Sequence, residues 1–153
     1  MKLKLHYAND IEDYNELLFH AAFQVLIDYV NNVKGQYRPN IKAIKTWEYG
    51  ADGRAPHVFE LAYSKANWFS RVFFRTRWAK HLAMSYLHHE INEVSGPDAQ
   101  LPDLEYAHHL KMLMDLYLWY TTEYKSLSKR EQYDIRDAKL AELMTIHQLF
   151  WDE

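Results

Sequence analysis

Histidine and carboxylate side chains cluster on both sides of a turn that the sequence predicts at residues 95–97. The residues of this group, together with one acid further along the chain, are His88, His89, Glu90, Glu93, Glu105, His108, His109 and Asp115. Imidazole and carboxylate groups are both common metal ligands and general acid–base groups. His89 and Glu93 are four residues apart, as are Glu105 and His109, so each pair lies on one face of a helix. One hypothesis is a metal site; the other is that solvated helix ends are simply rich in Glu and His.

The spacing of these acids is similar to that in the all-helical nucleotide pyrophosphohydrolases, which hold magnesium with ExxE and ExxD pairs. Glu90-x-x-Glu93 matches the first pair, and Met112-x-x-Asp115 matches the second except that Met replaces its Glu. This resemblance implies a metal-dependent nucleotide hydrolase, in which Glu90 and Glu93 with Asp115 or Glu105 hold a divalent cation. Glu105-x-x-His108 also resembles half of a di-iron bundle site, but that site requires two such motifs.

A basic group lies upstream, interleaved with aromatic residues. Its members are Arg71, Arg75, Arg77 and Lys80. Arg71 and Arg75 are one helical turn apart and could present two guanidinium groups to a phosphate or to an acidic partner. In the simpler interpretation, Phe69, Phe73 and Phe74 face the core, and the basic groups form its solvated rim. We expect these rings to be buried, which ranks nucleic-acid binding by this helix third among the functions considered.

Aromatic residues make up 16% of the chain, with 12 Tyr, 7 Phe and 5 Trp. Such rings fill hydrophobic cores and are also enriched in protein interfaces. One group of rings falls late in the chain: Tyr117, Trp119, Tyr120, Tyr124, Phe150 and Trp151. We predict that this group belongs to the core, and that His20, on an apolar helix, is a hydrogen-bonded core histidine.

Composition excludes several classes of protein. The chain of 153 residues has no cysteine, which rules out disulfides, thiolate catalysis and Cys-ligated zinc. Only 4 Gly are present, and neither a phosphate-binding glycine loop nor a Ser/His/Asp arrangement is visible, so no cofactor is predicted. A net charge of −3 disfavours a generic nucleic-acid binder. With no signal-peptide core and no long apolar run, we expect a cytoplasmic protein that does not enter a membrane.

Hydrophobic periodicity and capping residues predict four main helices. The first runs from about Ile11 to Val33, with Gly35 placed to stop it. A very long second helix, over 58–94, should break between Arg75 and Lys80. A third begins at Pro102 and ends near residue 124, and a capping box of Ser128 and Glu131 opens a fourth that ends near residue 151.

The long connection over 36–56 has a different composition, with Gly50, Gly53 and Pro56 as chain breakers. Ile41–Tyr49 is predicted as a strand, paired with alternating residues 2–6. The fold class expected for residues 1–153 is therefore one mainly α domain, a four-helix antiparallel bundle with a small strand pair.

Two segments near the end of the chain resemble small bacteriophage proteins. Residues 116–121 read LYLWYT, and residues 140–151 form a leucine-rich segment that ends in Phe150-Trp151. A Leu-Tyr-x-Trp segment and a closing leucine-rich helix are typical of a group of uncharacterised proteins of tailed bacteriophages. This resemblance implies expression in the cytoplasm of an infected bacterium. The leading functional prediction is a non-enzymatic protein that binds a host or phage protein, with self-association as a variant.

Overall fold

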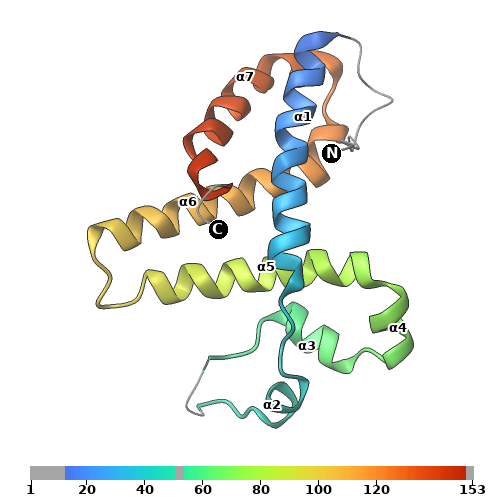
Figure 1. Ribbon diagram of the computed structural model, residues 1–153, viewed down its shortest axis with the longest axis vertical. Helices are drawn as coiled ribbons and strands as arrows, with labels where there is room; N and C mark the ends of the chain where they lie inside the picture. The colour runs from blue at the N-terminus through green and yellow to red at the C-terminus, as the bar shows by residue number, and fades with distance from the viewer. Residues whose placement is uncertain (1–12, 51–53, 151–153) are drawn as a thin grey trace.

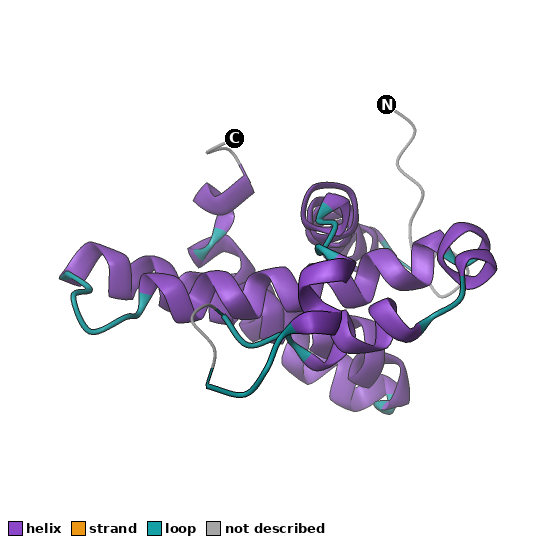
Figure 2. Cartoon of the chain, turned by 90° about the horizontal axis from the view of Figure 1, so that it is seen from below, coloured by secondary structure: helices purple, strands orange, loops and turns teal. Residues whose placement is uncertain are grey.

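The computed structural model describes residues 13–50 and 54–150, and every regular element within those ranges is helical (Figure 2). The α-helices are α1 Tyr14–Asp28, α2 Ile41–Thr46, α3 Val58–Lys65, α4 Trp68–Phe73, α5 Arg75–Val94, α6 Leu101–Leu118 and α7 Lys129–Thr145. The prediction of a mainly α fold is confirmed.

The two longest helices, α5 and α6, form an antiparallel hairpin, which α1 crosses at a steep angle (Figure 1). Helix α7 packs against α1 and α6 on one side of this hairpin. On the other side lie the short helices α2, α3 and α4 (Figure 1). The hairpin agrees with the predicted antiparallel packing, whereas a bundle of four aligned helices is not confirmed.

Helices α1 and α6 end in the same unusual way. Each continues into a π-helical turn, Tyr29–Val33 after α1 and Trp119–Glu123 after α6, and then into a 3-10 turn. Gly35 was expected to stop the first helix, but it lies inside the 3-10 turn Lys34–Gln36. The absence of a side chain at Gly35 matters here, because a Cβ atom would lie 3.0 Å from the Cβ atom of Ala79 on α5.

The predicted strand over Ile41–Tyr49 is wrong, because residues 41–46 form helix α2. The carboxamide of Asn40 accepts a hydrogen bond from the backbone N–H of Ala43 at 3.1 Å, which satisfies a free donor of the first turn. Ile44 is the buried residue of this helix. Residues 2–6, the predicted pairing partner, lie outside the described ranges.

The long second helix does break, but the predicted position is wrong. Residues 75–94 form one continuous helix, and the interruptions come earlier, at Ala66 and at Phe74. Asn67 opens α4 by accepting a hydrogen bond from the N–H of Ser70 at 2.7 Å. An N-cap residue inside an apolar run was therefore the signal that located the first break.

Helix starts were predicted more accurately in the second half of the chain. The capping box of α7 is confirmed: the Ser128 N–H donates to Oε2 of Glu131 at 2.7 Å, and the Glu131 N–H donates to Oγ of Ser128 at 3.3 Å. Pro102 lies in the first turn of α6, where its missing N–H costs nothing. Helix α1 begins at Tyr14, and its N-cap Asp13 accepts a hydrogen bond from the Glu16 N–H; the predicted start, Ile11, lies outside the described residues.

A cluster of five buried rings, which we name the ring core, joins α1 to the end of α6. It consists of Phe19, Phe23, Trp119, Tyr120 and Tyr124. The rings of Phe23 and Tyr120 stack with their centroids 4.7 Å apart. His20 is buried beside them, and its Nδ1 lies 2.7 Å from the hydroxyl of Tyr120, which confirms it as a hydrogen-bonded core histidine.

Of the other rings in the predicted late aromatic group, Tyr117 belongs to the hydrophobic core and Phe150 packs against it. Tyr117 is buried and donates its hydroxyl to Oδ1 of Asn31 at 2.9 Å. Phe150 is half-buried with its centroid 5.2 Å from that of Tyr29, and Trp151 lies outside the described residues. The prediction that these rings form core is therefore confirmed for Tyr117, Trp119, Tyr120 and Tyr124, whereas Phe150 is partly buried against the core.

Candidate docking surface and a buried polar cluster

Helix α4 carries exposed apolar side chains and buries none of its residues. We define the α4 patch as Trp68, Phe69, Val72, Phe73 and Phe74. Trp68 is 70% exposed and Phe73 is 64% exposed, and the rings of Phe69 and Phe73 stack on each other at 4.2 Å. The expectation that these rings are buried is wrong, because α4 lies at the edge of the fold (Figure 1), and no helix of residues 13–50 and 54–150 covers its outer face.

The four predicted basic residues do not form one surface. Arg75 and Arg77 are exposed at the start of α5, next to the α4 patch. Arg71 is half-buried with its guanidinium carbon 5.6 Å from the ring centroid of Tyr63. Lys80 is half-buried too, with Nζ 5.9 Å from the ring centroid of Tyr117. The simpler interpretation, a basic rim over buried rings, therefore describes Lys80 well, whereas Arg75 and Arg77 remain available to a partner.

Charge is strongly segregated around the α4 patch. From Leu61 to His89 the sequence contains no acidic residue, and its basic residues are Lys65, Arg71, Arg75, Arg77 and Lys80. None of the ion pairs found among the described residues uses any of these five side chains. Although the net charge of the chain is −3, the charged side chains of this segment are all basic.

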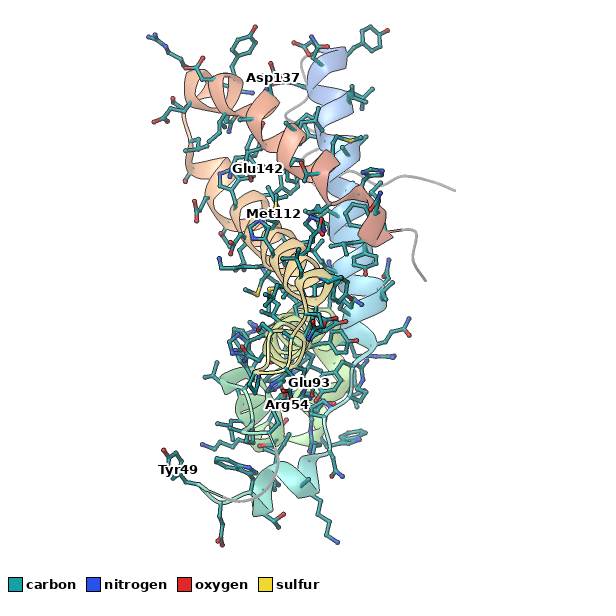
Figure 3. All side chains as sticks on the ribbon, turned by 90° about the vertical axis from the view of Figure 1, so that its left-hand side faces the viewer. Tyr49, Arg54, Glu93, Met112, Asp137 and Glu142 are labelled. Carbon is teal, nitrogen blue, oxygen red and sulfur yellow. The ribbon has the colours of Figure 1, made fainter. Side chains whose placement is uncertain are left out.

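The predicted metal-ligating residues are engaged elsewhere. Glu90 accepts a hydrogen bond from the hydroxyl of Tyr106 at 2.9 Å, and burial together with this carboxylate raises the pKa of Tyr106. Glu93 pairs with Arg54 at 2.8 Å, and Figure 3 shows the two side by side. Asp115 pairs with Lys111 on its own helix at 2.8 Å.

The remaining members lie on α6. Glu105 and His108 are exposed, and the rings of His108 and His109 are 6.3 Å apart. Within residues 13–50 and 54–150, no three His, Asp or Glu side chains gather in a way that could hold a metal ion. The hairpin thus brings the two helices together without directing the predicted ligands to one point.

A buried polar cluster at the α3–α5 contact was missed from the sequence. Nε2 of His89 lies 2.7 Å from Oε1 of Glu60, and both side chains are about 5% exposed (5% and 6%). Beside them, Oγ of Ser85 lies 3.0 Å from Nδ1 of His57. Glu60 and His89 are far apart in the sequence, so no spacing rule connects them. The available signal was a lone acid on the face of a short helix that packs against α5.

Burial controls the protonation of these histidines. Burial lowers the pKa of His89 below its ordinary value of 6.5, although the carboxylate of Glu60 opposes the shift. Burial also lowers the pKa of His57, and the neighbouring rings of His88 and His89 lower it further. Both imidazoles are therefore neutral at neutral pH, so the approach of His89 Nε2 to Glu60 Oε1 is a close polar contact and not a pair of opposite charges.

A cavity of about 390 Å³ opens beside this cluster, lined by Arg54, Pro56, His57, His88, His89 and Asn92. Its chemistry is limited by access to the reactive atoms. Ser85 is fully buried, so its hydroxyl cannot reach a substrate, and the acid–base pair of Glu60 and His89 is almost fully enclosed. We interpret the cluster as a polar contact that fixes α3 on α5.

Comparison of the chain with protein families, with curated proteins and with solved structures found no match. No helix in the described part of the chain is both long and apolar enough to cross a bilayer.

Proposed function

We propose that this chain is a non-enzymatic binding protein that docks through the α4 patch onto an acidic, partly apolar surface of another protein. The observation that carries the proposal is a continuous group of exposed rings on a helix that buries nothing. Soluble monomers rarely expose such a group unless it meets a partner. Aromatic residues and arginine are also the residue types enriched in interfaces and among their energetic hot spots.

Charge complementarity specifies the chemistry of the partner. Arg75 and Arg77 are exposed beside the rings, and no acidic residue occurs between Leu61 and His89. A partner with carboxylates around an apolar centre would match this arrangement, and the arginines would speed its encounter at low salt. The resemblance to tailed-bacteriophage proteins supplies the setting, so we extend the proposal to a host or phage protein in the cytoplasm of an infected bacterium.

The proposal is tested with a double variant, Trp68→Ala with Phe73→Ala, used beside the unaltered chain in affinity capture from bacterial and infected lysates. Because neither ring has a buried role, the variant should fold normally. A partner identified with the unaltered chain is then titrated with both proteins by calorimetry. We expect the variant to lose at least about tenfold in affinity, since each aromatic hot spot contributes about 2 kcal/mol.

Tyr49→Ala is the matched control. Tyr49 is 97% exposed and, as Figure 3 shows, points away from the body of the molecule; it is not part of the α4 patch. Equal loss of binding in the control and in the double variant would contradict docking through the α4 patch. Light scattering on the purified chain tests the alternative that the chain binds a second copy of itself. In that case the unaltered chain is a dimer, and the dimer disappears when Trp68 and Phe73 are replaced.

Binding of nucleic acid is the second candidate, and the pairing of exposed arginines with exposed rings favours it. Single-strand binders combine these two residue types, with bases stacking on the rings. Filter binding at low salt with single-stranded DNA and RNA separates the candidates. Retention that falls steeply with salt would favour nucleic acid. No retention at low salt leaves a protein partner.

A further inference from the structure

Three arginines from three separate segments line one small cavity at the base of α4. Arg38 follows the 3-10 turn after α1, Arg71 lies on α4 and Arg75 begins α5. Together with Tyr63 and Trp78 they surround a volume of about 80 Å³. A liquid water occupies about 30 Å³, so this space accommodates one small ion and not a drug-sized molecule.

Local contacts hold the walls of this cavity in place. Nη1 of Arg38 donates to the carbonyl oxygens of Gly35 and Tyr37 at 2.6 and 2.8 Å, which fixes its guanidinium at the rim. Arg71 packs on the ring of Tyr63, and its Nε is buried without a hydrogen-bond partner. Trp78 also lines the cavity, and its Nε1 donates to the hydroxyl of Ser70 at 3.3 Å.

The cavity is lined by positive charges without negative charges to balance them. No acidic side chain lines it, and among the described residues none of the ion pairs involves its three arginines. Three guanidinium groups around so small a space repel one another unless an anion lies between them. A buried donor without a partner, such as Nε of Arg71, has a similar requirement for an acceptor.

We propose that this cavity binds a phosphoryl-type oxyanion, either free phosphate or the phosphate group of a small ester. A tetrahedral dianion offers several acceptor oxygens, and guanidinium groups recognise such oxygens with paired N–H donors. A phosphate group fits the volume, while the remainder of an ester would extend past Arg38 and Arg75, which are exposed. The site adjoins the α4 patch but does not depend on the docking function.

Calorimetric titration of the full chain with sodium phosphate, against sodium chloride at matched ionic strength, tests the proposal. We expect saturable binding of one phosphate per chain and none of chloride. Arg75→Ala should weaken phosphate binding by about tenfold or more, because a charge-assisted donor pair is lost. Arg77→Ala is the matched control, since Arg77 is exposed on the same helix but does not line the cavity, and it should bind as the unaltered chain does.

Arg71→Ala is a second variant, and its folding is checked by circular dichroism because Arg71 also covers Tyr63. Equal binding by Arg75→Ala and the unaltered chain, or equal heats with phosphate and chloride, would overturn the proposal. Titration with phenyl phosphate separates the two sources: comparable affinity indicates a site for esters, and loss of affinity indicates a site for free phosphate. The Trp68→Ala and Phe73→Ala double variant should still bind phosphate, so failure here and failure of docking are distinguishable.

Discussion

The ring core and the α4 patch are both rich in aromatic residues, yet one is sealed and the other is open. Phe23 and Tyr120 are 0% exposed between two long helices, whereas Trp68 and Phe73 lie on a helix of six residues at the edge of the fold. Sequence composition is similar in both places. What differs is whether a second apolar element packs on top. High aromatic content thus indicates a core only where the topology supplies that second layer.

The largest effect on stability is expected from a substitution in the ring core, at Phe23. Phe23→Ala removes a ring that stacks on Tyr120 and contacts Phe19, so it should lower the free energy of unfolding by about 3–5 kcal/mol. Chemical denaturation measures this change, and thermal unfolding should show a midpoint lower by several degrees. A loss below about 1 kcal/mol would mean that the ring core does not hold α1 to the end of α6.

The buried polar cluster provides an intermediate case, in which polar contacts instead of rings hold α3 on α5. Glu60→Ala should cost about 1.5–3 kcal/mol, because it leaves the ring of His89 buried without its carboxylate partner. Urea unfolding of this variant, compared with the exposed substitution Glu48→Ala, measures the effect. A cost similar to that of Glu48→Ala would contradict a structural role for the pair.

The same cluster should make stability depend on pH. The pKa values of His57 and His89 are lower in the folded chain than the ordinary value of 6.5, so below that pH the unfolded chain binds protons that the folded chain does not. The free energy of unfolding should therefore fall as pH decreases from 7.5 to 5.5. Replacing both histidines with glutamine should flatten the dependence, and an unchanged slope would assign it to other groups.

A steric contact between Gly35 and Ala79 of α5 gives a comparable or smaller effect. Gly35→Ala places a methyl group 3.0 Å from the Cβ atom of Ala79 and should cost about 1–3 kcal/mol through overpacking. The compensating substitution Ala79→Gly removes the opposing methyl group. In a double-variant cycle, positive coupling between the two positions would confirm the contact, and simple additivity would contradict it.

The smallest effect on stability is expected from a substitution in the exposed α4 patch. Trp68→Ala should change the free energy of unfolding by no more than about 0.5 kcal/mol, as for other exposed positions. Chemical denaturation of Trp68→Ala and Phe23→Ala under the same conditions compares the two losses of stability directly. A loss above about 2 kcal/mol would show that Trp68 is part of the core after all and would remove the basis of the docking proposal.

Local signals in the sequence were sufficient for the capped helices and insufficient for the rest of the fold. The capping box of Ser128 and Glu131 was identified because its partners are three residues apart. The prediction of a strand over residues 41–49 was wrong, because the N-cap at Asn40 starts a helix there. The first break depended on Asn67, an equally local cap within an apolar run, whereas the second, at Phe74, has no side-chain cap.

The candidate surfaces could not be predicted from the sequence alone, because they depend on contacts between separate helices. The basic group was found from the sequence, yet which of its members face solvent depends on the rings of Tyr63 and Tyr117 that they meet. The contact between Glu60 and His89 joins two helices, and the cavity of three arginines joins three segments. Spacing along one helix cannot encode such contacts, because they arise only when separate elements pack.

The two π-turns have a consequence for how this chain tolerates insertions and deletions. A π-turn holds one residue more than the α-helical turn it replaces, and one residue corresponds to a rotation of about 100° around a helix axis. Deleting a single residue from Tyr29–Val33 would turn Gly35 away from Ala79 and move Arg38 off its cavity. Deleting one from Trp119–Glu123 would likewise rotate Tyr124 out of the ring core. At these two places the number of residues, more than their identity, determines what the following segment can touch.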